Sequence, residues 1–115
     1  MSAGPPIDIA PGDWLIVCNI LSRIYPEHEV WAFGSRARRS AKTYSDLDLA
    51  IIGPGPVSLA LMGELSEAFE ESALPFKVDL VDWAATSDSF RAIIEAGRVL
   101  IQSGRGGSGC AAPAS

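Results

Sequence analysis

Glycine and proline breaks confine every regular element of this chain to a short segment. The strongest break is the run Gly53-Pro54-Gly55-Pro56, and further breaks stand at Pro26, Pro75 and Gly97. These residues end helices and strands because proline lacks a backbone N–H and glycine adds backbone freedom. The 115 residues are therefore expected to form one small domain of short helices and short strands.

Apolar residues recur at helical spacing in three segments. The predicted helices span residues 11–25, 59–71 and 89–96. The first of them carries a second apolar stripe, made of Leu15, Ile16 and Ile20. That helix is therefore expected either to be nearly buried or to present one face to another protein, as a docking or self-association surface of a homo-oligomer.

Short runs of β-branched, aromatic or alternating residues predict strands. They span residues 29–34, 46–52, 76–83 and, as a short edge strand, 98–102. Helices and strands in this order indicate an α/β (α+β) fold, in which a small mixed β-sheet packs against helices. The Gly- and Ser-rich residues 103–115 have the composition of a flexible tail, so the folded domain is expected to span 1–102.

Composition excludes several classes of function. The net charge of −5 argues against direct binding of nucleic acid, which needs a basic surface. No apolar run is long enough to cross a bilayer, and the first residues do not resemble a signal peptide. The two cysteines are too few for a disulfide framework or a zinc cage. We therefore expect a cytoplasmic protein that binds neither membranes nor nucleic acids.

A Gly-Ser pair follows the first predicted strand. Gly34 and Ser35 stand between that strand and an Arg- and Ala-rich stretch suited to begin a helix. Backbone N–H groups at such a junction are unpaired and suit a phosphate, and the serine adds a hydroxyl donor. Taken alone, such a pair is more often an ordinary turn.

Two aspartates stand two positions apart in the next predicted strand. Asp46 and Asp48 then lie on one face of it, roughly 7 Å apart, while Leu47 and Leu49 point into the core. Carboxylate oxygens are hard ligands that hold Mg²⁺ together with substrate phosphates. The alternative is an exposed strand end with two surface acids, and for an Asp-x-Asp pattern alone this alternative is the more frequent one.

Basic residues gather just before these aspartates. Four of the nine Lys and Arg residues fall within seven positions, namely Arg36, Arg38, Arg39 and Lys42. In an acidic chain this local excess indicates an anion-binding site. The alternative is a basic loop that only neutralises the neighbouring carboxylates.

Together, these three features resemble a known family. Phe33–Arg38 (FGSRAR) and Ser45–Leu49 (SDLDL) match the signature of the DNA polymerase β-like nucleotidyltransferase superfamily, and most closely its minimal members, the MNT-domain proteins. The chain departs from that pattern at Arg39, where glycine is customary. Residues 90–101 are also similar to the family's closing helix and strand, so the resemblance covers nearly the whole expected domain.

The resemblance implies a third carboxylate on a later strand. The predicted strand 76–83 offers Asp79 and Asp82, which are three apart and lie on opposite faces. Val78 and Leu80 are expected to point inward, which leaves Asp79 in mid-strand on the other face. Asp79 is therefore the preferred candidate, and Asp82 is the alternative.

A Mg²⁺-dependent nucleotidyltransferase is what the resemblance implies. The implied catalytic residues, which would also hold two Mg²⁺ ions, are Asp46, Asp48 and Asp79. The residues implied to bind the triphosphate of ATP are Gly34, Ser35, Arg36 and Lys42.

Small proteins of this family commonly act as antitoxins, and the resemblance implies that role here. They move AMP from ATP onto a tyrosine hydroxyl of a helical HEPN-type toxin. A chain this small has little room for an acceptor pocket of its own, which agrees with an acceptor supplied by another protein. The alternatives are a catalytically inactive antitoxin that acts by occlusion and nucleotidyl transfer to a small molecule such as an aminoglycoside.

Overall fold

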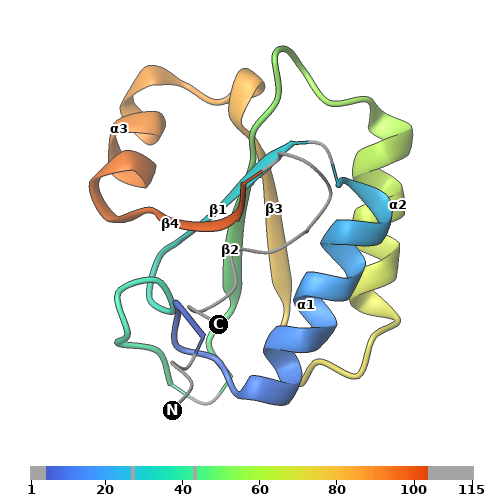
Figure 1. Cartoon of the computed structure of the whole chain (residues 1–115). Helices are drawn as coiled ribbons and strands as arrows, with labels where there is room; N and C mark the ends of the chain where they lie inside the picture. The colour runs from blue at the N-terminus through green and yellow to red at the C-terminus, as the bar shows by residue number, and fades with distance from the viewer. Residues whose placement is uncertain (1–4, 27, 43, 104–115) are drawn as a thin grey trace.

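The computed structural model describes residues 5–26, 28–42 and 44–103 (Figure 1). Its helices are α1 (Pro11–Ile24), α2 (Leu59–Glu70) and α3 (Asp88–Gly97). Its strands are β1 (Glu29–Phe33), β2 (Leu47–Ile51), β3 (Val78–Asp82) and β4 (Val99–Ser103). Every element begins and ends within two residues of its predicted bounds. A short 3-10 turn, η1 (Trp83–Ala85), was not predicted from the sequence.

The four strands form one mixed sheet with the order β3-β2-β1-β4. β1 pairs antiparallel with both β2 and β4, whereas β2 and β3 are parallel. A parallel pair needs a crossover connection, and α2 provides it. The mixed sheet and the edge position of β4 confirm two predictions, and β3 forms the opposite edge.

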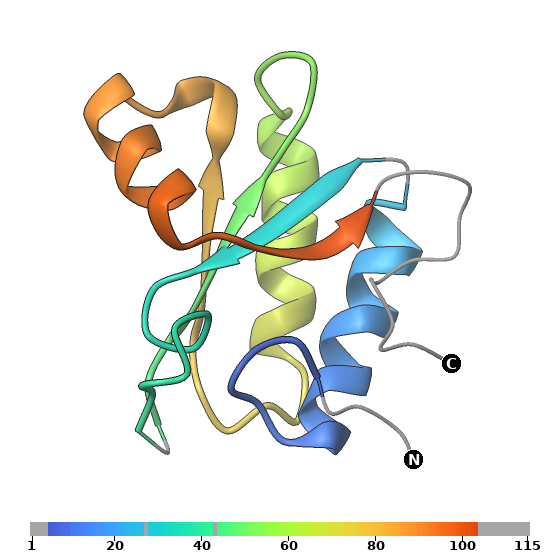
Figure 2. The ribbon, with the colours of Figure 1, turned by 60° about the vertical axis from the view of Figure 1, so that its left-hand side comes forward.

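Helices cover the two faces of this sheet unequally. α1 and α2 pack side by side on one face, where the larger core includes Val17, Leu49 and Leu65, all fully buried (Figure 2). On the other face, α3 supplies Ile94 to a smaller cluster with Trp31 of β1. The second face is therefore covered over only part of its area. Asp48 and Asp79, two of the predicted catalytic residues, lie on that face.

Serine side chains fix the starts of two helices. The Ser58 hydroxyl accepts the Leu61 N–H at 3.1 Å, and the Ser87 hydroxyl accepts the Phe90 N–H at 3.2 Å. A serine at this position satisfies one of the four backbone donors that a helix start leaves unpaired. The chain therefore enters α2 and α3 at defined residues directly after each loop.

The apolar stripe predicted on α1 is mostly covered. Ile20 is buried and Ile16 packs against the core, so only Leu15 of the three is exposed. Of the two expectations for this helix, near-complete burial is confirmed for most of the stripe. A single exposed leucine is a small apolar surface and does not by itself indicate an interface.

The segment before α1 takes part in the core, which the sequence pattern did not indicate. Ile7 and Ile9 are buried, and the Asp8 N–H donates to the Arg36 carbonyl at 2.8 Å. This segment therefore packs against the loop that follows β1. Of the predicted tail 103–115, Ser103 is the last residue of β4, and residues 104–115 lie outside the described residues. Within the described ranges, no helix has the length and apolar character needed to span a membrane.

Candidate active site

Two of the three predicted carboxylates lie side by side on neighbouring strands. Asp48 of β2 and Asp79 of β3 are paired in the parallel register. Side chains at paired positions point to the same face of a sheet, and neighbouring strands are about 4.8 Å apart. Asp46 is exposed and comes one residue before β2 begins. The three acids therefore occupy one end of the β2–β3 pair.

A glycine brings the chain against Asp48 from the other side. β1 ends at Phe33, which pairs with Asp48 in the antiparallel register. Gly34 follows with a φ of 80°, in the left-handed region, and a Cβ placed on it would overlap Asp48 Oδ2. Both observations require glycine here. Asp48 thus lies between the Gly-Ser turn and Asp79.

The residues after Gly34 form one helical turn with a closed end. The Arg38 N–H donates to the Gly34 carbonyl at 3.1 Å, which makes the turn. The Ser40 N–H then donates to the Ser35 carbonyl at 2.9 Å, and the Arg39 N–H to the Arg36 carbonyl at 3.3 Å. These are the two bonds of a Schellman motif, which needs a left-handed residue at its end.

Arg39 occupies that left-handed position, with a φ of 58°. Glycine is the usual residue there, because a side chain in this conformation costs about 1–2 kcal/mol. The guanidinium of Arg39 also donates to the Pro5 carbonyl at 2.6 Å. The turn expected after Arg38 therefore forms although this chain lacks the customary glycine.

The electrostatics of the site are dominated by unbalanced negative charge. Burial raises the pKa of Asp48 above its ordinary value, and the carboxylates of Asp79 and Asp46 raise it further. Arg38 acts in the opposite direction and lowers the pKa of Asp48. Lys77 Nζ lies 3.7 Å from Asp79 Oδ1, in an ion pair exposed to solvent. Asp48 consequently lies where a cation would be strongly favoured.

The basic residues near the site divide into different roles. Arg36 is buried, and its guanidinium donates to the Ser45 carbonyl at 2.9 Å and to the Asp8 carbonyl at 2.8 Å. It also lies 4.0 Å from the centre of the Phe76 ring. Through these contacts Arg36 connects the segment before α1 to the loop before β2. They argue against the expected role of Arg36 at the triphosphate.

Lys42 is exposed, as a phosphate ligand would need to be, but its surroundings are those of another surface. It lines a shallow hollow together with Asp8 and Asp13, near the start of α1. Arg38, which was predicted only as one member of the basic cluster, is instead the cation whose charge lowers the pKa of Asp48. Lys42 and Arg38 belong to the same basic cluster in the sequence, and only the path of the loop places them on different surfaces.

Asp82, the alternative third acid, is engaged elsewhere. Its Oδ2 accepts the Val57 N–H at 2.9 Å, and its Oδ1 accepts the Ala84 N–H at 3.2 Å. Its register partner is Ile51 rather than an acid. The geometry therefore favours Asp79, and gives Asp82 the role of holding the loop before α2 and starting η1.

The donor set at this end of the sheet suits Mg²⁺. Within the described ranges, no three acidic, histidine or cysteine side chains meet closely enough to hold one ion between them. Mg²⁺ is commonly bound by one or two carboxylates, with substrate phosphates and waters completing the shell. The register pair of Asp48 and Asp79, with Asp46 beside it, fits that pattern of binding.

Comparison with known proteins agrees with this arrangement. The family model described as "Polymerase beta, Nucleotidyltransferase" matches residues 20–105. A protein of Haemophilus influenzae, described as probable protein adenylyltransferase MntA, is 49% identical over 102 residues, which cover 89% of this chain and 90% of that protein.

Solved structures share the fold at lower identity. A toxin–antitoxin structure with AMP-PNP matches with a TM-score of 0.64 and 22% identity, over 76% of this chain and 71% of that one. A structure of a tri-AMPylated Shewanella oneidensis HEPN toxin in complex with its MNT antitoxin matches with a TM-score of 0.57 and 20% identity, over 76% and 67%. The fold, the site at the ends of β1, β2 and β3, and the close relative together show that this chain is a nucleotidyltransferase of the polymerase beta family, similar to its MntA members.

Proposed function

We propose that this protein transfers AMP from ATP, with Mg²⁺, onto a hydroxyl group of a partner protein. The observation that carries the proposal is the register pair of Asp48 and Asp79, set against the Gly34 turn. A turn that suits phosphate beside hard oxygen ligands is what nucleotidyl transfer requires. The adenylyltransferase description of the 49% identical relative supports AMP as the transferred group.

The chain's own residues then have separate roles. Gly34 and Ser35 would hold the triphosphate through backbone N–H groups and the serine hydroxyl. Asp46, Asp48 and Asp79 would hold two Mg²⁺ ions, which supply charge neutralisation and a lowered pKa for the attacking hydroxyl. In place of Arg36, Arg38 would balance charge near the phosphates, with Lys42 as a second cation at longer range.

Asp79 has the additional role of accepting the proton of the acceptor hydroxyl. It lies on the outer strand of the sheet, with Asp48 on its inner side. A hydroxyl that approaches from outside therefore reaches Asp79 first. The hydroxyl oxygen forms a bond to the α-phosphorus, pyrophosphate leaves with the bonding electrons, and the proton goes to Asp79.

The proposed partner is a helical HEPN-type toxin, silenced by the AMP that it receives. The support is that two structural neighbours are toxin–antitoxin assemblies, one of them with an AMPylated toxin. This reaction would take place in the cytoplasm, where ATP is supplied. Modification of a macromolecular partner also agrees with the open, edge-on position of Asp79.

The test is transfer of label from ATP to a HEPN-type partner protein, sought in the open reading frame adjacent to this one. In the presence of Mg²⁺, the wild-type chain should label that protein, and Asp46→Asn or Asp48→Asn should abolish the label. Asp88→Asn is the matched control, because Asp88 is an exposed acid in the first turn of α3. Full neutralisation of the toxin by the Asp46 and Asp48 variants would show that occlusion, not catalysis, is the function. Label on small-molecule acceptors alone would show the other alternative.

A further inference from the structure

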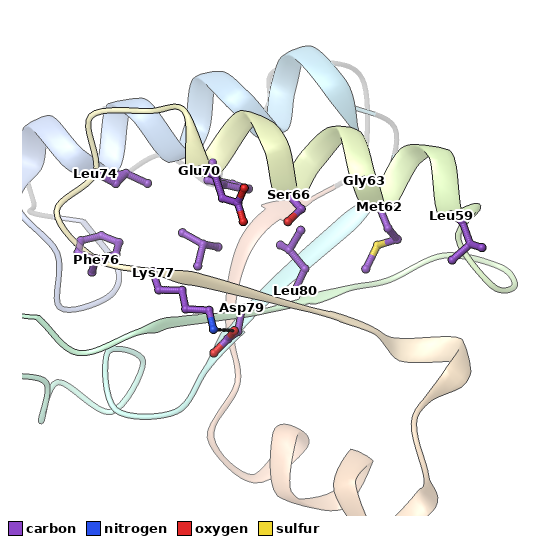
Figure 3. A pocket seen from close by; sticks show the side chains of 12 residues that line it. Leu59, Met62, Gly63, Ser66, Glu70, Leu74, Phe76, Lys77, Asp79 and Leu80 are labelled. Atoms are coloured by element: carbon purple, nitrogen blue, oxygen red, sulfur yellow. Dashed lines mark ion pairs between the residues drawn. The ribbon is translucent and has the colours of Figure 1, made fainter.

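A groove of about 720 Å³ runs between α2 and the outer strand β3 (Figure 3). Its walls are polar and apolar in nearly equal parts, and in the apolar part Met62 and Phe69 from α2 face Phe76 and Leu80. Asp79 stands at its rim beside Lys77, with which it forms the ion pair drawn in the figure. The groove is thus continuous with the candidate active site at one residue, Asp79.

The strand beside this groove has an open backbone edge. In the part of the chain that the structure describes, β3 is the last strand of the sheet and pairs only with β2. The Lys77 carbonyl accepts the Leu47 N–H at 2.9 Å, so the backbone groups of Lys77, Asp79 and Val81 face β2. The N–H and C=O groups of Val78 and Leu80 then face outward, which is where a further strand can pair.

We propose that this groove and edge bind the acceptor segment of the partner protein, as an extended peptide added to β3. This inference rests on the proposed function and specifies how the acceptor segment binds beside the active site. A strand added to β3 would lie about 4.8 Å away, with one of its residues directly beside Asp79. That residue's side chain would point to the same face as Asp79 and bring its hydroxyl to the carboxylate.

The alternation of strands specifies the chemistry of the acceptor segment. The neighbours of the hydroxyl-bearing residue point to the opposite face, beside Val78 and Leu80, and enter the apolar part of the groove. The recognised pattern is therefore a hydroxyl residue with an apolar residue on each side. Charge has a small part in this recognition, because Lys77 offsets one of the two acids at the groove, Glu70 and Asp79.

Gly63 offers a direct way to block the groove. It lines the groove from α2, and a Cβ built on it meets nothing within 4 Å. Gly63→Trp should therefore fill the groove without a clash, and replacing a glycine inside a helix does not weaken the helix. Gly12→Trp is the matched control, since Gly12 is a helical glycine with the same free space on α1, which does not line this groove.

The probe is a fluorescent nonapeptide in which tyrosine is flanked by two valines within glycine and serine. Its comparison peptide has the same composition, with the valines moved one position outward, onto the face of the tyrosine. The wild-type chain and Gly12→Trp should bind the first peptide at least tenfold more tightly than the second. Gly63→Trp should lose that preference and transfer at least tenfold less AMP to the peptide, while MgATP affinity stays within twofold.

Backbone pairing is tested by N-methylation of the probe at alternate residues. Methylation of one set of amides should abolish binding, and methylation of the other set should leave it unchanged, because only one set faces β3. Equal binding of all peptides, or wild-type transfer by Gly63→Trp, would overturn the proposal. A wild-type dimer that Gly63→Trp converts to a monomer would assign the groove to self-association and overturn it as well.

These measurements separate the two proposals. Peptide binding without nucleotide tests the groove alone, whereas transfer from ATP to the intact partner tests the function. If the wild-type chain labels its partner while Gly63→Trp labels it equally, the function stands and the groove proposal is wrong. If the wild-type chain labels nothing, the proposed function fails even where the peptide binds.

Discussion

Strand β2 presents Leu47, Leu49 and Ile51 to α1 and α2, and it presents Asp48 to the other face of the sheet. The three aliphatic side chains have no exposed surface and belong to the larger core. Asp48 is half-buried among other carboxylates, with a pKa raised first by burial and then by Asp79 and Asp46. One five-residue strand therefore carries fully buried aliphatic side chains on one face and a carboxylate with a raised pKa on the other.

The difference between the two faces shows how a small domain can hold a charged site. Burial of aliphatic side chains on one face stabilises the strand by about 1.5–3 kcal/mol for each of them. This stabilisation offsets the repulsion among carboxylates on the other face. The two faces should accordingly respond to mutation in opposite ways, and the following experiments test that contrast.

The largest effect is expected on the acidic face, in catalysis. Asp48→Asn should lower AMP transfer by a factor on the order of 10³, because it would remove a proposed Mg²⁺ ligand and its charge from the site. Quantification of label on the partner protein measures this. Transfer reduced less than tenfold would mean that Asp48 is not part of the catalytic site.

The next effect is expected on the apolar face, in stability. Leu49→Ala should lower the free energy of unfolding by roughly 3 kcal/mol, because Leu49 is fully buried and its removal leaves a cavity. Ile51→Val, with one methylene less, should lower it by about 1 kcal/mol. Urea unfolding followed by circular dichroism gives both values. A cost below 1 kcal/mol for Leu49→Ala would contradict the contrast between the faces.

A substitution at Gly34 should affect both stability and catalysis. Gly34→Ala should cost about 1–2 kcal/mol of stability, because the residue has a φ of 80° and a Cβ would overlap Asp48. It should also lower AMP transfer at least tenfold by displacing that carboxylate. Gly55→Ala is the control, since a Cβ there meets nothing within 4 Å, and it should change neither quantity appreciably.

The pH dependence of stability gives a smaller effect with a defined sign. The pKa of Asp48 is raised in the folded state, so its contribution to stability is present at low pH and is lost as pH rises through the folded-state value. Without Mg²⁺, Asp48→Asn should therefore raise Tm at pH 7, and by less as the pH falls toward 4.

Mg²⁺ should make the wild-type chain more stable than Asp48→Asn, the reverse of the order expected without Mg²⁺. At ten times its Kd, Mg²⁺ should stabilise the wild-type chain by about 1.4 kcal/mol and leave Asp48→Asn almost unchanged. Thermal unfolding with Mg²⁺ or with EDTA measures both cases. An Asn variant less stable than wild type at pH 7 in EDTA would contradict the account of charge on this face.

The smallest effect is expected at Arg39. Arg39→Gly should raise the free energy of unfolding by about 0.5–1 kcal/mol, because it removes a side chain from a left-handed residue. Arg39→Ala keeps the strain and loses the hydrogen bond to Pro5, so it should be less stable than wild type. A stabilised alanine variant would show that the left-handed conformation is not the cause.

Local patterns explain what the sequence could predict. The spacing of apolar residues and the Gly and Pro breaks located every helix and strand, and alternation in β2 placed Leu47 and Leu49 in the core. The identity of the third acid needed more, because Asp79 and Asp82 differ only in what they meet in space. Asp79 is supported because it pairs in register with Asp48. The carboxylate of Asp82 instead accepts hydrogen bonds from two backbone N–H groups.

Long-range packing explains what the sequence could not predict. Arg36 stands in the basic cluster, yet it is buried because the segment around Asp8, far away in sequence, folds over it. The charge of Arg38 reaches Asp48 only because the turn after Gly34 closes as it does. No periodicity in a single chain encodes contacts of this kind, since they depend on how separate segments meet.

The most direct test compares Asp79→Asn with Asp82→Asn in AMP transfer from labelled ATP to the partner protein. The two acids share one strand, but only Asp79 lies beside Asp48. Asp79→Asn should lower transfer by a factor of about 10²–10³. Asp82→Asn should keep it within threefold of wild type, since the amide oxygen still accepts one of the two backbone N–H groups and the bond that is lost lies in a loop outside the site. Wild-type transfer by Asp79→Asn, with loss in Asp82→Asn, would contradict the site described here.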